Sequence, residues 1–292
     1  MRLNKGLMMG AVALVGVLAL AGCSDSGTPG TDAPDVNTGA EFEAGTTMAK
    51  VSDAGAITIG TKFDQPLFGL TGPSGPEGFD VEIGKMIAAE LGIAPEGIKW
   101  VETVSANREP FIESGQVDLV IATYTINDTR KEVVDFAGPY YEAGQDFLVL
   151  AGNPDGIENV DSFKNDPNLA VCTVTGSTSL KNISEYTSNV LQAETYSACL
   201  EPLRNGEVSA VTTDNVILAG LADQNEGEFE VLDQTFTAEP YGIGLKKGDD
   251  AFRTFINDTL EASYEDGRWA KAWESTAGKV LATPTPPAVD RY

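Results

Sequence analysis

The chain has 292 residues, 42% of them hydrophobic and 22% charged, and its formal net charge is −25. A chain of this length can bury one large or two moderate hydrophobic cores. The strong negative charge argues against nucleic acid and anionic membrane surfaces as partners, and it means that a site for an anionic ligand must be locally basic. Histidine is absent, which excludes imidazole catalysis and histidine-ligated metal, and we expect neither a metal nor another cofactor.

The first 45 residues have the composition of a secretion signal followed by a linker. Arg2 and Lys5 precede a short apolar stretch, and small residues then lead to Cys23. The apolar stretch is too short for a transmembrane span, so residues 1–22 are predicted to be a signal peptide, with an uncleaved anchor as the alternative. Residues 23–45 are rich in Ser, Gly, Thr, Pro and Asp, which predicts a flexible tether.

The alternation of apolar and helical patterns predicts an α/β protein. A helix is expected over residues 46–54, a strand over 57–60 and a helix over 81–91, which is the opening unit of a doubly wound lobe. Residues 108–113 and the strand that begins at Val117 repeat this unit.

Two apolar strands, 147–150 and 240–245, are the candidate crossings between two lobes. They predict lobe 1 over residues 46–145 plus 241–283 and lobe 2 over 146–240. Residues 284–292 are rich in proline at their start and are expected to form a loose tail.

A predicted helix near the C-terminus carries apolar side chains on one face over residues 249–264. Trp269 and Trp273 continue this face four residues apart. We expect these aromatic side chains to pack in the core and not to stack on a ligand.

Cys172 and Cys199 form an even pair of cysteines after the predicted signal. Cys172 lies in an apolar strand and Cys199 begins a predicted helix. In an oxidising location a bridge between them would stabilise the fold by about 3–4 kcal/mol. The alternative is a pair of buried free thiols.

Two segments far apart in the sequence share one layout, SGQVDLVIAT at 114–123 and NGEVSAVTTD at 205–214. In each, a glycine suited to a helix cap is followed by an apolar strand and a polar tip. Small ligands bind beyond the carboxyl ends of strands in open α/β sheets. Two facing lobes would place Thr123 and Arg130 on one side of a cleft and Asp214 on the other, which suits the carboxylate and the ammonium of an α-amino acid. Taken alone, Arg130 could equally be a solvated surface arginine.

The motifs of residues 56–277 resemble those of the bacterial solute-binding proteins of family 3, which deliver polar amino acids to ABC importers. The shared motifs are GFDVEIGKMIAAELG, NREPFIESGQVDLV, TYTINDTRKEVVDFAGPYY, TGSTS, GEVSAVTTD and PYGIGLKKG. The segments IGTKFDQP, SANRE, VCTVTGST and TYSACLE are similar to glutamate-binding proteins of actinobacteria. The resemblance implies the type II periplasmic-binding-protein fold, with two doubly wound lobes joined by a two-strand hinge.

The resemblance also implies how the α-groups of an amino acid are held. Arg130 matches the arginine that grips the ligand carboxylate bidentately in related proteins, and Thr125 would donate to the same carboxylate. Thr123 and Asp214 would hold the ammonium. Asp214 is also the carboxylate that an enzyme on this scaffold, of the cyclohexadienyl dehydratase or lytic transglycosylase type, would use.

Further residues are implied for the ligand side chain and for lobe 2. Lys62 and Arg108, with Ser105 beside it, match positions that contact acidic side chains; an ordinary exposed lysine and a helix-start arginine are the alternatives. Ser177 and Thr178 begin a helix whose backbone amides would face an anion. Tyr196 would lend its hydroxyl, unless it packs on the lobe surface. Residues 63–65 offer no firm equivalent of the aromatic that stacks on the ligand in relatives.

The resemblance predicts a monomeric, lipid-anchored binding protein with no catalytic residues. It would close on L-glutamate, or a close acidic or amide amino acid, and deliver it to an ABC permease. Leu-Ala-Gly-Cys at 20–23 resembles a lipobox, which implies a lipidated Cys23 on the outer face of the cell membrane. Besides the enzyme already mentioned, a ligand-sensing component is the remaining alternative.

Overall fold

The computed structural model describes residues 34–292. The predicted signal peptide, the lipobox with Cys23 and the first part of the tether lie outside the described residues. The described part of the chain contains two five-stranded sheets and one small three-stranded sheet. No helix within residues 34–292 combines the length and the apolar character needed to cross a membrane.

The first large sheet has the strand order β5-β1-β6-β13-β7. Its members are β1 (Ile57–Thr61), β5 (Ile98–Glu102), β6 (Leu119–Val120), β7 (Val134–Ala143) and β13 (Glu239–Lys246). Strand β1 pairs in parallel with β5 and β6, and β13 pairs antiparallel with β6 and β7. The small antiparallel sheet, which follows β1 in the chain, consists of β2 (Asp64–Gln65), β3 (Gly69–Gly72) and β4 (Gly75–Glu77). We call the elements built on these two sheets lobe 1.

The second large sheet has the order β10-β9-β11-β8-β12. Its members are β8 (Gln145–Leu150), β9 (Val171–Val174), β10 (Val190–Ala193), β11 (Ala210–Asp214) and β12 (Phe229–Val231). Strand β9 is parallel to β10 and β11, while β8 is antiparallel to β11 and β12. We call the elements built on this sheet lobe 2.

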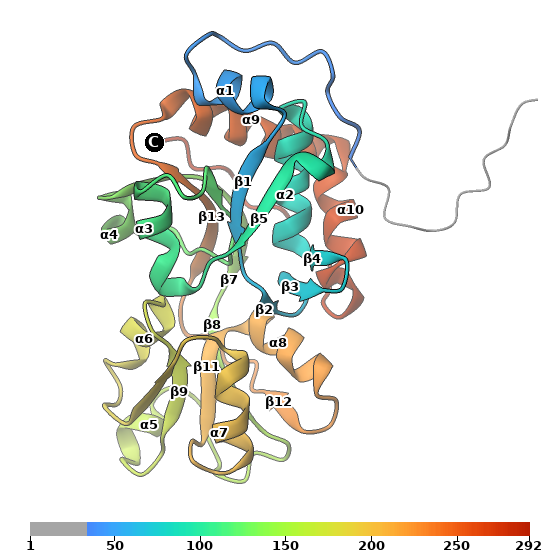
Figure 1. Ribbon diagram of the computed structural model, residues 1–292. Coiled ribbons are helices and arrows are strands. Elements are labelled where there is room, and N and C mark those ends of the chain that lie inside the picture. The colour runs from blue at the N-terminus through green and yellow to red at the C-terminus, as the bar shows by residue number, and fades with distance from the viewer. Residues whose placement is uncertain (1–33) are drawn as a thin grey trace, which may run out of the picture. The chain divides into compact units, whose positions relative to one another are not determined.

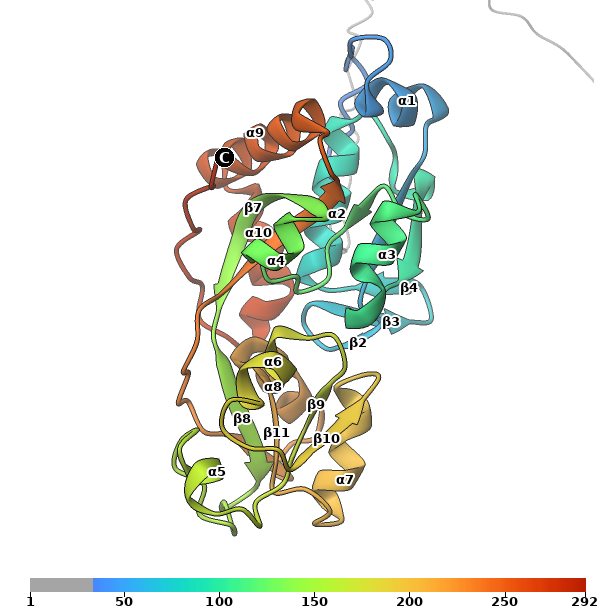
Figure 2. The ribbon, with the colours of Figure 1, turned by 90° about the vertical axis from the view of Figure 1, so that its left-hand side faces the viewer.

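Helices surround both sheets (Figures 1 and 2). They are α1 (Thr47–Ala54), α2 (Phe79–Glu90), α3 (Arg108–Glu113), α4 (Asp128–Lys131), α5 (Ser162–Asn165), α6 (Thr178–Ile183), α7 (Leu200–Arg204), α8 (Asn215–Gln224), α9 (Asp250–Asp266) and α10 (Arg268–Ser275), with short 3-10 helices at Pro95–Gly97, Ser105–Asn107, Ser197–Cys199 and Ala277–Lys279. The predicted first helix begins where Thr46 caps it, because the Thr46 hydroxyl accepts a hydrogen bond from the Ala49 amide.

The chain passes twice between the two large sheets. It leaves lobe 1 at the end of β7 and enters β8 directly after Gly144, and it returns between β12 and β13. Figure 1 shows β7 continuing into β8 from one sheet to the other. The α/β architecture with two lobes and two connecting strands agrees with the fold class expected from the sequence.

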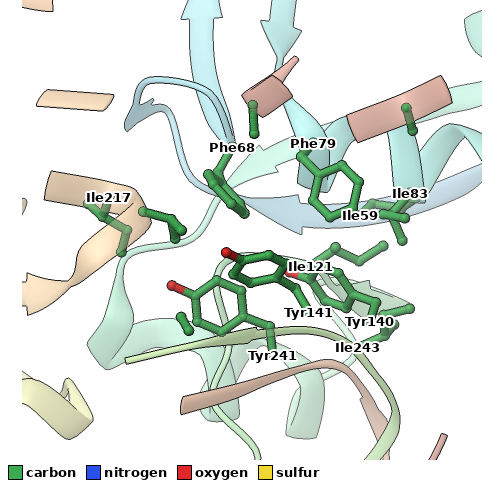
Figure 3. Close-up of a cluster of buried hydrophobic side chains, with 14 of the residues drawn as sticks. Ile59, Phe68, Phe79, Ile83, Ile121, Tyr140, Tyr141, Ile217, Tyr241 and Ile243 are labelled. Atoms are coloured by element: carbon green, nitrogen blue, oxygen red, sulfur yellow. The ribbon is translucent and has the colours of Figure 1, made fainter. Parts of the chain in front are cut away.

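A cluster of aromatic side chains forms the centre of the core in lobe 1 (Figure 3). The rings of Trp269 and Trp273 are buried and stack on each other, and Trp273 also stacks on Tyr141 with 5.0 Å between ring centroids. Phe79 of α2 packs edge-on against both tryptophans. These tryptophans pack in the core, as the four-residue spacing predicted.

The predicted disulfide is present in lobe 2, where Cys172 of β9 is bonded to Cys199. Both residues are fully buried. The bridge ties the central part of the sheet to the segment that precedes α7.

Residues 284–292, expected to form a loose tail, are extended and carry several contacts with lobe 1. The Tyr292 hydroxyl accepts a hydrogen bond from the Phe136 amide of β7, and the Tyr292 ring lies 3.9 Å from Lys131 Nζ. Arg291 forms ion pairs with Asp258 and Glu261 of α9. These contacts fix the tail along β7, a strand at the edge of the sheet, and cover part of that edge.

Candidate functional site

A small pocket lies between the two lobes. Lobe 1 and lobe 2 both contribute to its walls, which are lined by Ser105, Arg108, Thr123, Thr125, Ser177, Thr178, Ser179, Tyr196, Asp214 and Ile217. The lining contains the predicted site residues except Lys62 and Arg130, and it adds Ser179 and Ile217.

The sequence contains a signal for one of the two added residues but not for the other. Ser179 belongs to the TGSTS motif, so the motif itself could have pointed to it. Ile217 lies in the first turn of α8, where an apolar residue is indistinguishable by sequence from one that packs in the core.

Asp214 ends β11 and stands at the start of α8, which places its carboxylate at the tip of the sheet. Its Oδ2 accepts a hydrogen bond of 2.7 Å from the Tyr241 hydroxyl. Its Oδ1 is buried and has no hydrogen-bond partner within residues 34–292. Burial, together with the nearby Glu239 carboxylate, raises the pKa of Asp214 to about 7. A buried carboxylate oxygen without a donor is unfavourable, and a cation in the pocket would relieve this.

Arg108 is the buried cation of the lobe 1 wall. Its Nη1 donates to the carbonyl oxygens of Ala122 and Thr123 at 3.2 and 3.3 Å, and its Nε donates to the Ser105 carbonyl. The guanidinium carbon lies 4.3 Å from the centre of the Tyr124 ring. These contacts fix its position, although Arg108 is also the first residue of α3, as the alternative interpretation held.

Lys62 is buried behind the wall and does not line the pocket. Its Nζ donates to Ser105 Oγ at 2.9 Å, so Ser105 lies between the lysine and the pocket. Burial and the neighbouring Arg108 lower the pKa of Lys62 to about 7. The alternative of an exposed lysine is therefore wrong.

Arg130 lies on α4 directly outside the pocket lining. Its Nη1 donates to the Thr125 carbonyl at 2.7 Å, and its Nε pairs with Glu109 at 3.0 Å. Its Nη2 reaches across to the Gly176 carbonyl of lobe 2 at 3.3 Å. These bonds use three of the five N–H donors of the guanidinium. Burial and the nearby Arg108 lower the pKa of Arg130 to about 10, so the group stays charged at neutral pH.

Thr123 has an unusual backbone conformation, with φ at 45°. A β-branched residue rarely adopts positive φ, so neighbouring groups must hold it there. The Thr123 amide donates to Asp80 Oδ2 at 2.8 Å, and its hydroxyl donates to Gln65 Oε1 at 2.9 Å. Asp80 also accepts a hydrogen bond of 2.6 Å from the Tyr140 hydroxyl, and burial raises the pKa of Asp80 to about 7.

Sequence reasoning missed the role of Asp80. An acidic residue in the first turn of a helix is usually read as a favourable partner of the helix dipole, and Asp80 is in the first turn of α2. Only the packed structure brings its carboxylate to the Thr123 backbone.

The lobe 2 wall uses some of its polar groups internally. The Ser177 hydroxyl caps α6 by accepting from the Leu180 amide, and the Ser177 amide donates to the Val174 carbonyl. The Ser177 amide is therefore already used, which corrects the expectation that it would face an anion. Tyr196 is buried, and its hydroxyl lies 3.4 Å from Ser179 Oγ. Thr178 meets Thr125 of lobe 1 with 3.4 Å between hydroxyl oxygens.

The described residues contain no group of three or more acidic or cysteine side chains placed to hold a metal ion. The pocket instead opposes a carboxylate with one unpartnered oxygen, Asp214, to a wall that holds the buried Arg108 guanidinium. Such an arrangement can bind a small molecule that carries both charges.

The family model for bacterial extracellular solute-binding proteins, family 3, matches residues 57–277. The chain therefore belongs to this family of solute-binding proteins, and the relatives named below are binding proteins, not enzymes.

Individual relatives and solved structures agree with this assignment. The chain is 35% identical over 276 residues to the ABC transporter glutamine-binding protein GlnH of Bacillus subtilis, covering 93% of this chain and 97% of that protein. It is 37% identical over 286 residues to the glutamate-binding protein GluB of Corynebacterium glutamicum, covering 94% and 90%. A solved structure of an ancestral arginine-binding protein bound to glutamine has a TM-score of 0.69 and 32% identity, covering 76% of this chain and 97% of that one.

Proposed function

We propose that this protein binds L-glutamate, or a close acidic or amide amino acid, between its two lobes and delivers it to an ABC permease. The observation that carries the proposal is the buried, unpartnered Oδ1 of Asp214 in a pocket whose opposite wall holds Arg108. An α-ammonium group would supply the missing donor. The names of the relatives GluB and GlnH, a glutamate-binding and a glutamine-binding protein, support the same ligand class.

Arg130 would bind the α-carboxylate, with help from Thr125. Its guanidinium already bonds to the Thr125 carbonyl, and Thr125 lines the pocket. To reach a carboxylate, Arg130 would exchange its contact with Gly176 for a contact with the ligand and keep its pairing with Glu109. A carboxylate is the stronger acceptor for a guanidinium, which favours this exchange.

The ligand side chain would lie toward Arg108 and Ser105, with Lys62 behind Ser105. The buried Arg108 guanidinium favours a side-chain carboxylate over an amide because an amide carries no charge to offset it. A carboxylate would also favour the protonated form of Lys62, whose pKa is about 7. This asymmetry is why we place glutamate ahead of glutamine.

We also propose that Cys23 is lipidated and that residues 23–45 tether the protein to the outer face of the cell membrane. The two crossings between β7 and β8 and between β12 and β13 would act as the hinge on which the lobes close. The division predicted from the sequence, residues 46–145 plus 241–283 for lobe 1 and 146–240 for lobe 2, differs from these crossings only in that Gln145 lies in β8 and Glu239 and Pro240 lie in β13. A ligand that touches both walls would then stabilise the closed form.

Isothermal titration of the purified chain with L-glutamate, L-glutamine, L-aspartate, L-arginine and L-leucine tests the ligand class. We expect L-glutamate to bind most tightly and L-arginine and L-leucine to bind weakly or not at all. Tightest binding of the cationic or the apolar amino acid would contradict the proposal. The Asp214→Asn variant serves as the control for binding in this pocket.

A further inference from the structure

Asp64 makes a direct contact between the two lobes that is separate from the pocket. It lies in β2 of the small lobe 1 sheet, two residues after Lys62. Its Oδ2 accepts a hydrogen bond of 3.1 Å from the Tyr196 amide, and the Ser197 amide and hydroxyl each lie 3.4 Å from the same oxygen. One carboxylate oxygen of lobe 1 therefore faces three donors of lobe 2.

The lobe 2 segment that donates these hydrogen bonds, Tyr196 and Ser197, contributes to the pocket wall. The Tyr196 side chain lines the pocket and is buried, so the backbone that Asp64 holds also positions this wall residue. Ser197 begins the short 3-10 helix Ser197–Cys199, and Cys199 is bonded to Cys172 of β9. The disulfide restrains the segment from within lobe 2, and Asp64 restrains it from lobe 1.

Asp64 differs in one respect from two other polar contacts that cross between the lobes near the pocket. Thr125 with Thr178, and Arg130 with Gly176, involve residues of the pocket or groups assigned to the ligand carboxylate. Asp64 is half-buried and is not among the residues that line the pocket. A change at Asp64 can therefore weaken closure without removing a ligand contact.

We propose that Asp64 is an interlobe latch, a positioning residue that holds the Tyr196–Ser197 segment of lobe 2 against lobe 1 and so slows ligand release. The latch rests on the proposed function only for its effect on ligand release. The bonds to Asp64 require the two lobes to be together, so they stabilise the closed form over the open form. A ligand enclosed between the lobes leaves after they open, and the latch therefore acts on the dissociation rate.

Two measurements on the full chain test the latch. The first is hydrogen exchange at the Tyr196 and Ser197 amides without ligand, compared between the wild type and the Asp64→Ala variant. We expect both amides to exchange at least about tenfold faster in the variant, since hydrogen bonds to a charged group are among the stronger ones. The second is stopped-flow dissociation of L-glutamate, for which we expect about a tenfold faster rate and a nearly unchanged association rate.

Two further variants serve as controls. Glu77→Ala removes one negative charge from β4 of the same small sheet, at an exposed residue whose side chain has no hydrogen bond or ion pair within residues 34–292. We expect it to leave both readouts unchanged. Asp64→Asn keeps an acceptor oxygen without the charge and should restore part of the amide protection and part of the slow release.

Equal amide exchange in the wild type and in Asp64→Ala would overturn the latch whether or not L-glutamate binds. Faster exchange with an unchanged dissociation rate of bound L-glutamate would overturn its effect on release. If the wild type binds none of the amino acids tested, while Asp64→Ala still loses amide protection, the proposed function fails and the interlobe contact stands.

Discussion

The two walls of the pocket carry opposite charges and hold them in different ways. On the lobe 1 side, the guanidinium groups of Arg108 and Arg130 are held by backbone carbonyls and by Glu109, and both lie over the Tyr124 ring. On the lobe 2 side, Asp214 keeps one oxygen without a partner within the described residues. Under the proposed function, the cations of lobe 1 are therefore already held in place before the ligand binds, whereas the ligand would supply the missing partner of Asp214 in lobe 2.

The largest expected loss of affinity comes from a change at Asp214 in the lobe 2 wall. Asp214→Asn removes the charge that would meet an ammonium, and we expect the affinity for L-glutamate to fall by about 3–5 kcal/mol in titration calorimetry. The thermal stability of the ligand-free variant at pH 8 should not fall, because the substitution removes an unpaired buried charge. A variant that binds as tightly as the wild type would refute the role of Asp214.

On the lobe 1 side, Arg130→Ala should reduce the affinity by about 2–5 kcal/mol, the usual result of removing one member of a buried charged pair. Arg130→Lys is the matched variant, because it keeps the charge but loses the planar fork of donors. We expect it to recover only a small part of the affinity. Full recovery with lysine would show that charge alone, and not bidentate geometry, is needed.

The two walls should also respond differently to pH. With the pKa of Asp214 near 7, acidification protonates the carboxylate that would hold the ammonium, while Arg130, whose pKa is about 10, remains charged. We expect the affinity for L-glutamate to fall by up to about tenfold per pH unit below pH 7. In Asp214→Asn, measured at higher protein concentration, this fall should be absent, and the remaining pH dependence should come from Lys62 and Asp80, whose pKa values also lie near 7. An equal pH dependence in both proteins would assign the titration to another group.

The stability of the ligand-free protein has its own dependence on pH. Asp80 and Asp214 have raised pKa values, so the folded state keeps protons that the unfolded state has lost, and their contribution to stability falls as pH rises from about 4 to about 7. Lys62 has a lowered pKa, so its contribution rises with pH from about 7 to about 10. Thermal unfolding of wild type and Asp80→Asn across this range tests this for Asp80. The stability of the variant should fall less than that of the wild type as pH rises from about 4 to about 7.

A smaller effect is expected where the backbones of the lobes approach each other. A Cβ placed on Gly220 of α8 would lie 2.6 Å from the Pro66 carbonyl oxygen of lobe 1. Gly220→Ala should therefore hinder closure and weaken L-glutamate binding by about 1–3 kcal/mol. The same change favours the helix by about 1 kcal/mol, so the melting temperature of the ligand-free protein should not fall. Weaker binding accompanied by a large loss of stability would indicate damage to lobe 2 instead.

The sequence by itself predicted an α/β protein with two lobes and favoured the disulfide, and its resemblance to family 3 implied most of the residues that line the pocket. The matching layouts at 114–123 and 205–214 indicated two strands with polar tips, and Thr123 and Asp214 do line one pocket. This worked because apolar periodicity reports which strands are buried, and the end of a buried strand fixes where the next side chains lie.

Only the tertiary structure decided which partners the charged side chains have. It placed Lys62 behind Ser105, joined Arg130 to Glu109 and Gly176, and brought Asp80 to the Thr123 backbone. It also brought Asp64 to Tyr196 and Ser197 across the gap between the lobes. Long side chains can point in several directions from one backbone position, and the packed neighbours that select among them come from distant parts of the chain.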